Sequence, residues 1–168
     1  MNYPDDLKEL YFEFGLAAEM AQVMELEAGN FAMTFITAWY DTSTITDEQR
    51  EFFRALIDDV NKRTFGNLVK HIRSAAQLDD KIVEIVENAL EKRNYLIHKF
   101  FQSHNFAIHS EDGRKKMRSE LHEIYKALSL AHTVLTGMTS TFKQVVGQED
   151  ISIETAENLI ANGKRIKI

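Results

Sequence analysis

Two long segments of the chain have apolar residues at every position of a strict three–four alternation. The first segment covers residues 7–38 and the second covers residues 117–145. Apolar residues at this spacing lie along one face of an α-helix, whereas a strand, whose side chains alternate every two residues, cannot use the pattern. The alternation therefore predicts two long helices, near residues 5–40 and 113–146.

Shorter helices are predicted between and after these segments. They are indicated at residues 46–60, where Thr46 to Gln49 form a capping box, at residues 65–72, from Asp79 onward and at residues 152–161, with an irregular loop at residues 103–113. The sequence contains no internal repeat and no linker. We therefore expect one all-α domain over residues 1–168, an antiparallel bundle of about four to six helices with a short C-terminal extension from about residue 148.

The composition excludes several classes of site and protein. The chain has no cysteine, so disulfides and thiolate metal sites are both excluded. Met1 is followed by acidic residues rather than by the basic and then apolar stretches of a signal peptide. Polar residues interrupt every long apolar run, so no segment is predicted to span a membrane. We therefore expect a soluble cytoplasmic protein.

The charges are distributed unevenly along the chain. The formal net charge of −6 argues against a protein coated with nucleic acid. Residues 1–91 carry a net charge of −10, residues 92–118 carry +5 and residues 119–168 carry −1. A local basic field on an acidic chain suits one focused anionic ligand. The four basic residues between Arg114 and Arg118 equally fit the solvated start of a helix.

One predicted helix has polar residues where its apolar stripe should continue. The stripe runs from Leu78 to Phe101 at three- and four-residue spacing, and its extension by whole turns lands on Arg93. Asn94 and His98 fall on the edge of the stripe, one turn apart from each other. Charged groups rarely occupy such positions without a partner or a functional role. These three residues are therefore the main candidate site.

The segment ALEKRNYLIHKFF (residues 89–101) resembles the HEPN superfamily (higher eukaryotes and prokaryotes nucleotide-binding domain). The resemblance implies a helical bundle, usually a homodimer in which the two motifs meet across the interface. It also implies metal-independent endoribonuclease activity of toxin–antitoxin or phage-defence type, with RNA as substrate and a cognate antitoxin or neutralising protein as a possible partner. Arg93 and His98 match the catalytic pair of the family, and Asn94 matches its common polar residue after the arginine. Phe100 stands where one subgroup has a modified tyrosine, so that mode of control is not expected here.

The candidate residues suit RNA cleavage without a metal or another cofactor. The imidazole of His98 can move a proton of the 2′-hydroxyl near neutral pH. The guanidinium of Arg93 can hold the phosphate and offset charge in the transition state. Asn94 can orient the imidazole or donate a hydrogen bond to a phosphate oxygen. Three further residues, Lys92, Lys99 and His104, are expected to bind the substrate.

The same residues also fit roles other than catalysis. Arg93 equally fits an ion pair with a carboxylate or a cap on a neighbouring helix, with His98 as a partly buried histidine. The chain would then be a non-catalytic domain that binds RNA or nucleotides, or a helical protein-interaction module. A metal site built from His98, His104 and His109 is disfavoured by their irregular spacing. The aromatic residues around the motif, Tyr95, Phe101 and Phe106, are assigned to core or dimer packing rather than to stacking on bases.

Overall fold

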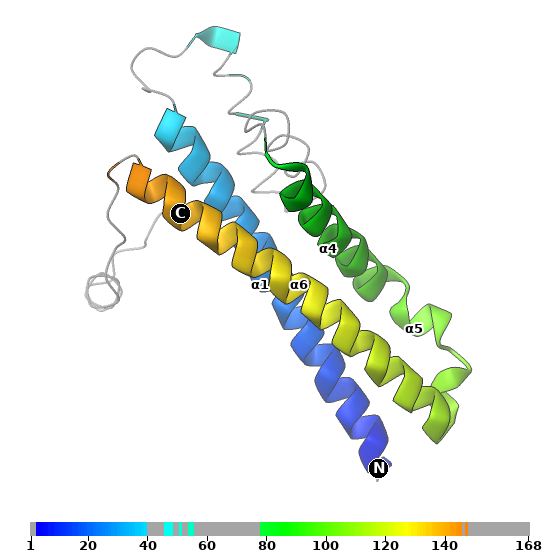
Figure 1. The fold of residues 1–168 in the computed structure, drawn as a ribbon. Coiled ribbons are helices and arrows are strands. Elements are labelled where there is room, and N and C mark those ends of the chain that lie inside the picture. Colours follow the sequence, from blue (N-terminus) through cyan, green and yellow to red (C-terminus); the bar gives the residue numbers. More distant parts are fainter. Residues whose placement is uncertain are drawn as a thin grey trace, which may run out of the picture.

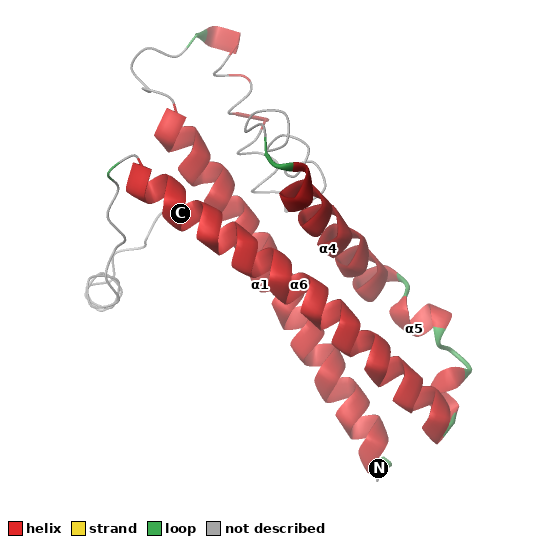
Figure 2. Cartoon of the chain, viewed as in Figure 1, coloured by secondary structure: helices red, strands yellow, loops and turns green. Residues whose placement is uncertain are grey.

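The computed structural model of the chain describes residues 3–39, 46–48, 51, 54–55, 78–145 and 147, which form helices joined by short turns. The elements are α1 (Asp5–Trp39), α4 (Asp80–His98), α5 (Phe100–Ser103), the 3₁₀ helix η1 (Ala107–His109) and α6 (Glu111–Val145) (Figure 1). Figure 2 shows no strand among these described residues. The prediction of an all-α fold is therefore confirmed, and both long helices lie within two residues of their expected bounds.

The two long helices lie side by side and run in the same direction, so the antiparallel arrangement predicted for the bundle holds for α4 and not for this pair (Figure 1). Arg114 near the start of α6 pairs with Asp6 near the start of α1, and Phe142 near the end of α6 contacts Phe31 of α1. Helix α4 runs antiparallel to both long helices and packs chiefly against α6. It returns the chain to the end of the bundle where α1 begins, and α6 therefore starts from that same end.

The predicted apolar stripes form the hydrophobic core. Side chains from four helices are buried there: Leu10, Ala17, Ala21, Met24, Ala28 and Phe31 of α1, Val86, Ala89 and Leu96 of α4, Phe100 of α5, and Met117, Leu121, Ile124, Leu128, Ala131 and Leu135 of α6. The alanines of α1 allow close packing of its neighbours, because helix separation depends on the side chains at the contact. Each large side chain buried here contributes about 1.5–3 kcal/mol to the free energy of unfolding.

Helix α4, which carries the candidate site, begins where the sequence predicts. Asp79 is its N-cap residue, and the Asp79 carboxylate accepts a hydrogen bond of 2.8 Å from the backbone N–H of Lys81. This bond satisfies one of the backbone donors that the first turn of a helix leaves unpaired. At the other end, the backbone N–H of Lys99 still donates to the Tyr95 carbonyl at 2.8 Å, and the backbone then turns into α5.

The irregular loop predicted at residues 103–113 is only partly correct. The 3₁₀ helix η1 occupies its centre, and α6 begins at Glu111 rather than after Gly113. Ser110 accounts for the early start, because its hydroxyl accepts a hydrogen bond of 3.1 Å from the backbone N–H of Gly113. A Cβ atom at Gly113 would lie 2.0 Å from the Ala107 carbonyl oxygen. Gly113 is therefore required by close packing inside the first turn of α6 and does not mark a loop.

Several predictions concern residues outside the described part of the chain. They are the helix over most of residues 46–60, the helix at residues 65–72, the C-terminal extension from about residue 148 and the terminal helix at residues 152–161. Among the helices that the structure describes, none combines the length and the apolar character needed to cross a bilayer.

Candidate functional site

Arg93 lies on the core-facing side of α4, as its place on the apolar stripe predicts. It falls between the buried residues Ala89 and Leu96, and its side chain is 22% exposed. The Arg93 guanidinium forms an ion pair through Nε with Oε1 of Glu25 on α1, whose side chain is 13% exposed. Removing either partner would leave a charge in a largely desolvated place, which is strongly unfavourable. The ion pair places the guanidinium at the α1–α4 interface through charge attraction rather than a directed hydrogen bond, because Oε1 of Glu25 is a buried atom with no hydrogen-bond partner.

Asn94 and His98 extend from this ion pair toward the solvent. Nη1 of Arg93 donates a hydrogen bond of 3.0 Å to Oδ1 of Asn94. His98 lies one turn further along and is the last residue of α4. Both Asn94 and His98 are exposed, and the His98 side chain makes no hydrogen bond or ion pair with any other described residue. The structure thus joins Arg93 to Asn94 and leaves the imidazole of His98 accessible to a ligand.

His104, which is predicted to bind substrate, belongs to a separate cluster. Its Nε2 atom lies 2.6 Å from Oε2 of Glu120 on α6 and 3.4 Å from the hydroxyl of Tyr95 on α4. Burial raises the pKa of the Tyr95 hydroxyl, and the hydrogen bond to Glu120 adds to this increase. The cluster links α4, the segment after α5, and α6, so His104 takes part in a contact between elements of the fold.

The two lysines predicted to bind substrate lie at different places on α4. Lys92 is half-buried on the helix, and together with the larger effect of Lys126 it lowers the pKa of Glu123 on α6. Lys92 therefore lies toward α6. Lys99 follows the last residue of α4 and is exposed next to His98. Of the two lysines, Lys99 is the one that adjoins the exposed imidazole.

The arginines of the basic stretch are paired inside the fold. Arg114 Nε lies 2.5 Å from Oδ2 of Asp6. Arg118 contacts Glu9 at 2.5 Å and Glu13 at 2.7 Å, and the hydrogen bond to Glu13 raises the pKa of the guanidinium. The acidic N-terminal half of α1 thus neutralises part of the positive charge predicted for residues 92–118. These arginines stabilise the contact between α1 and α6 and are not free to bind an anionic ligand.

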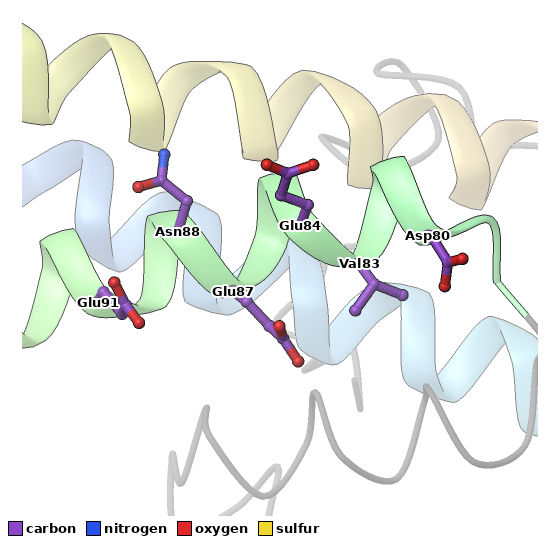
Figure 3. Close-up of a pocket in the computed structure, with 6 residues that line it drawn as sticks. All are labelled: Asp80, Val83, Glu84, Glu87, Asn88 and Glu91. Carbon is purple, nitrogen blue, oxygen red and sulfur yellow. The ribbon is translucent and has the colours of Figure 1, made fainter.

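The outer face of α4 that leads to His98 is acidic. Asp80, Glu84, Glu87 and Glu91 follow one another at alternating spacings of four and three residues, and the same series continues through Asn94 to His98. An open pocket of about 300 Å³ lies along this face, lined by Asp80, Val83, Glu84, Glu87, Asn88 and Glu91 (Figure 3). Carboxylates repel anions, so this face of α4 disfavours a phosphate group. In the described ranges, no three His, Asp or Glu side chains are arranged to hold a metal ion.

Most of the aromatic residues near the site belong to the core. Phe100 is 1% exposed, and its ring lies 5.9 Å from that of Phe14 on α1. Phe101 packs at 4.8 Å from Phe14 and at 5.8 Å from Tyr11. Phe106, by contrast, is 85% exposed. The aromatic rings near the site therefore divide into Phe100 and Phe101, which are buried and half-buried and position α5 against α1, and Phe106, which stays accessible.

Sequence reasoning did not identify Glu25 and Glu120 as partners of the site. Glu25 directly follows Met24, which belongs to the core stripe of α1. A carboxylate at the edge of an apolar stripe could have indicated a partner for Arg93. Glu120 gave no comparable signal, because acidic residues at the edge of an exposed helix face are common. Both partners depend on contacts between helices that are distant in the sequence.

The chain matches no protein-family model, and neither a curated protein nor a solved structure is significantly similar to it. The functional proposal therefore depends on the residues of this chain alone. They define an all-α protein whose α4 helix carries Arg93, paired with Glu25 and hydrogen-bonded to Asn94, and ends at the exposed His98.

Proposed function

We propose that the chain is a HEPN-like, metal-independent endoribonuclease that uses Arg93, Asn94 and His98. One observation supports this proposal above the others: Arg93, Asn94 and the exposed imidazole of His98 all belong to the last six residues of one helix, α4. A phosphate-binding cation and a proton-transfer group on one helix are the parts that cleavage of RNA without a metal requires.

The proposed reaction uses the 2′-hydroxyl of the substrate as the nucleophile. His98 accepts the proton of this hydroxyl, and the oxygen attacks the adjacent phosphorus. The bond from phosphorus to the 5′-oxygen of the next nucleotide breaks, and that oxygen takes up a proton as it leaves. Arg93 offsets the negative charge that builds up on the phosphate oxygens, and Asn94 supports it. The products are a 2′,3′-cyclic phosphate and a free 5′-hydroxyl.

The proposal includes a cytoplasmic homodimer in which the C-terminal ends of the two α4 helices lie near each other. Two copies of the motif would supply both the base and the acid that the reaction needs. Ile97, directly before His98, is exposed, and so is Phe106 after α5. Large apolar side chains beside a polar site are typical of surfaces that become buried in complexes. An antitoxin that covers this surface would inhibit the enzyme.

The test is cleavage of RNA by the purified chain and by two histidine variants. We expect His98→Ala to lower the cleavage rate by about 10²- to 10⁴-fold, because it removes the proton-transfer group. His109→Ala is the matched control, since His109 is also an exposed histidine but ends η1. The control should cleave like the wild type, and EDTA should change none of the rates. Equal cleavage by His98→Ala and the wild type would contradict the assignment.

A non-catalytic helical binding module is the second candidate. It is favoured by the observation that Arg93, Arg114 and Arg118 are all paired with carboxylates of α1. These guanidinium groups already have carboxylate partners within the fold, so they do not need a phosphate group as a partner. Binding of RNA or of a partner protein without any cleavage, in the wild type as well as in His98→Ala, would support this candidate instead.

A further inference from the structure

Helix α1 has a second apolar stripe on the side opposite the core. Phe12, Leu16, Val23 and Leu26, here called the outer stripe, are all exposed, with Phe12 at 67% and Leu26 at 58%. Together with Glu19, these four residues follow the alternating four- and three-residue spacing of a coiled-coil seam. Glu19 is the one acidic residue in this series. Such a row of large apolar side chains on one helix face is typical of a surface that binds another helix.

The charges at the outer stripe are almost all negative. Glu19 lies in the middle of the stripe and is exposed, and it makes no ion pair with the other described residues. Glu13 and Glu27 flank the same side of the seam, where Glu13 contacts Arg118 and Glu27 accepts a hydrogen bond from Thr139. Lys8, near the start of the helix, is already paired with Asp5. A helix that docks here therefore meets apolar residues and a negative field.

A second copy of this chain does not fit the outer stripe. Glu19 is the central position between Phe12 and Leu26. In a parallel, in-register pair Glu19 would face Glu19 of the other copy, and in an antiparallel pair centred on the stripe the two carboxylates would also meet. Like charges placed opposite each other at a helix seam select against that pairing. A helix that binds the outer stripe is instead expected to place a basic residue opposite Glu19.

We propose that the outer stripe of α1 binds a basic amphipathic helix of a partner protein, with a lysine or arginine of that helix opposite Glu19. Phe12 and Leu26 contact apolar residues of the partner, since large exposed side chains at the ends of a seam act as anchors. Glu19 sets the register, as a single polar residue at a seam position does in coiled coils. This surface lies on α1 and uses neither Arg93 nor His98, so it is independent of the proposed ribonuclease site.

The test uses the full-length chain and two synthetic helical peptides of about three heptads. Both peptides carry leucine at the seam positions, and they differ only at the central seam position, which is lysine in one and glutamate in the other. Fluorescence anisotropy should show that the wild type binds the lysine peptide at least about tenfold more tightly than the glutamate peptide. Glu19→Lys should reverse this preference, and Phe12→Ala should weaken the binding of the lysine peptide by about tenfold or more.

The matched control is Glu91→Lys, which makes the same charge change at an exposed position of α4. It should leave the preference for the lysine peptide unchanged. Equal binding of the two peptides by the wild type would overturn the proposal, as would an effect of Glu91→Lys as large as that of Glu19→Lys. Light scattering provides a further check: a wild-type oligomer that dissociates on Phe12→Ala would assign the stripe to a second copy of the chain.

Discussion

The interface between α1 and α6 and the C-terminal end of α4 both contain polar side chains, but they differ in how these side chains are bonded. At the interface, Arg118 contacts both Glu9 and Glu13, and the hydroxyl of Thr139 donates to Glu27. At the end of α4, His98 is exposed and makes no such contact with the described residues. Polar side chains that form hydrogen bonds or ion pairs within the fold contribute to its stability, and this accounts for their presence. The exposed imidazole of His98 makes no such contribution to the fold, so the end of α4 is where we propose the function.

The largest effect that we predict concerns the aromatic residues that follow α4. Phe100→Ala should lower the free energy of unfolding by about 3–5 kcal/mol, because it removes a buried ring that packs against Phe14. Phe106→Ala is the control, and it should change that free energy by less than about 0.5 kcal/mol, because Phe106 is exposed. Urea denaturation followed by circular dichroism measures both values. Similar losses for the two variants would show that the end of α4 is packed differently.

The next prediction compares two carboxylates of α1. Glu25→Ala should lower the free energy of unfolding by about 1–3 kcal/mol, because it leaves the guanidinium of Arg93 partly buried without a counterion. Under the proposed function it should also slow RNA cleavage by roughly ten- to a hundredfold, because Arg93 is no longer held in place. Urea denaturation and a cleavage assay on the same preparation separate these two effects.

Glu13→Ala is the matched control for this prediction. Glu13 also pairs with an arginine, Arg118, but at the α1–α6 interface, where both side chains are about one-third exposed. Its loss should lower the free energy of unfolding by about 1 kcal/mol or less and leave cleavage unchanged. If Glu13→Ala slowed cleavage as much as Glu25→Ala does, the distinction between the two regions would fail.

The smallest effect that we predict is a pH dependence at the start of α1. The hydrogen bond from Lys8 lowers the pKa of the Asp5 carboxyl below its ordinary value of 3.8, and the charge of Lys8 adds to this shift. A carboxyl whose pKa is lowered by folding stabilises the protein above its ordinary pKa, and this contribution is lost as the pH falls through the lowered value. NMR titration of Asp5 should give a pKa that rises toward 3.8 in Lys8→Met. An unchanged value would show that the Lys8–Asp5 pair is not formed in solution.

The helices could be predicted from the sequence because their pattern is local. Each long helix has its own unbroken apolar stripe, and a stripe at this spacing is compatible with one type of secondary structure only. The start of α4 was also local, because the Asp79 side chain caps the helix to which it belongs. The start of α6 lies two residues before residue 113, near which it was expected. The need for glycine at position 113 depends on the backbone of Ala107, which the fold brings into close contact with it.

The candidate site could be predicted in part, for the same reason. The positions of Arg93, Asn94 and His98 on α4 follow from helical periodicity, so their order from the core to the solvent could be read from the sequence. The sequence alone could not determine that Glu25 binds Arg93, that Glu120 binds His104, or that the acids of α1 neutralise Arg114 and Arg118. Each of these pairs joins two helices, and which of their faces meet depends on the directions in which the helices pack.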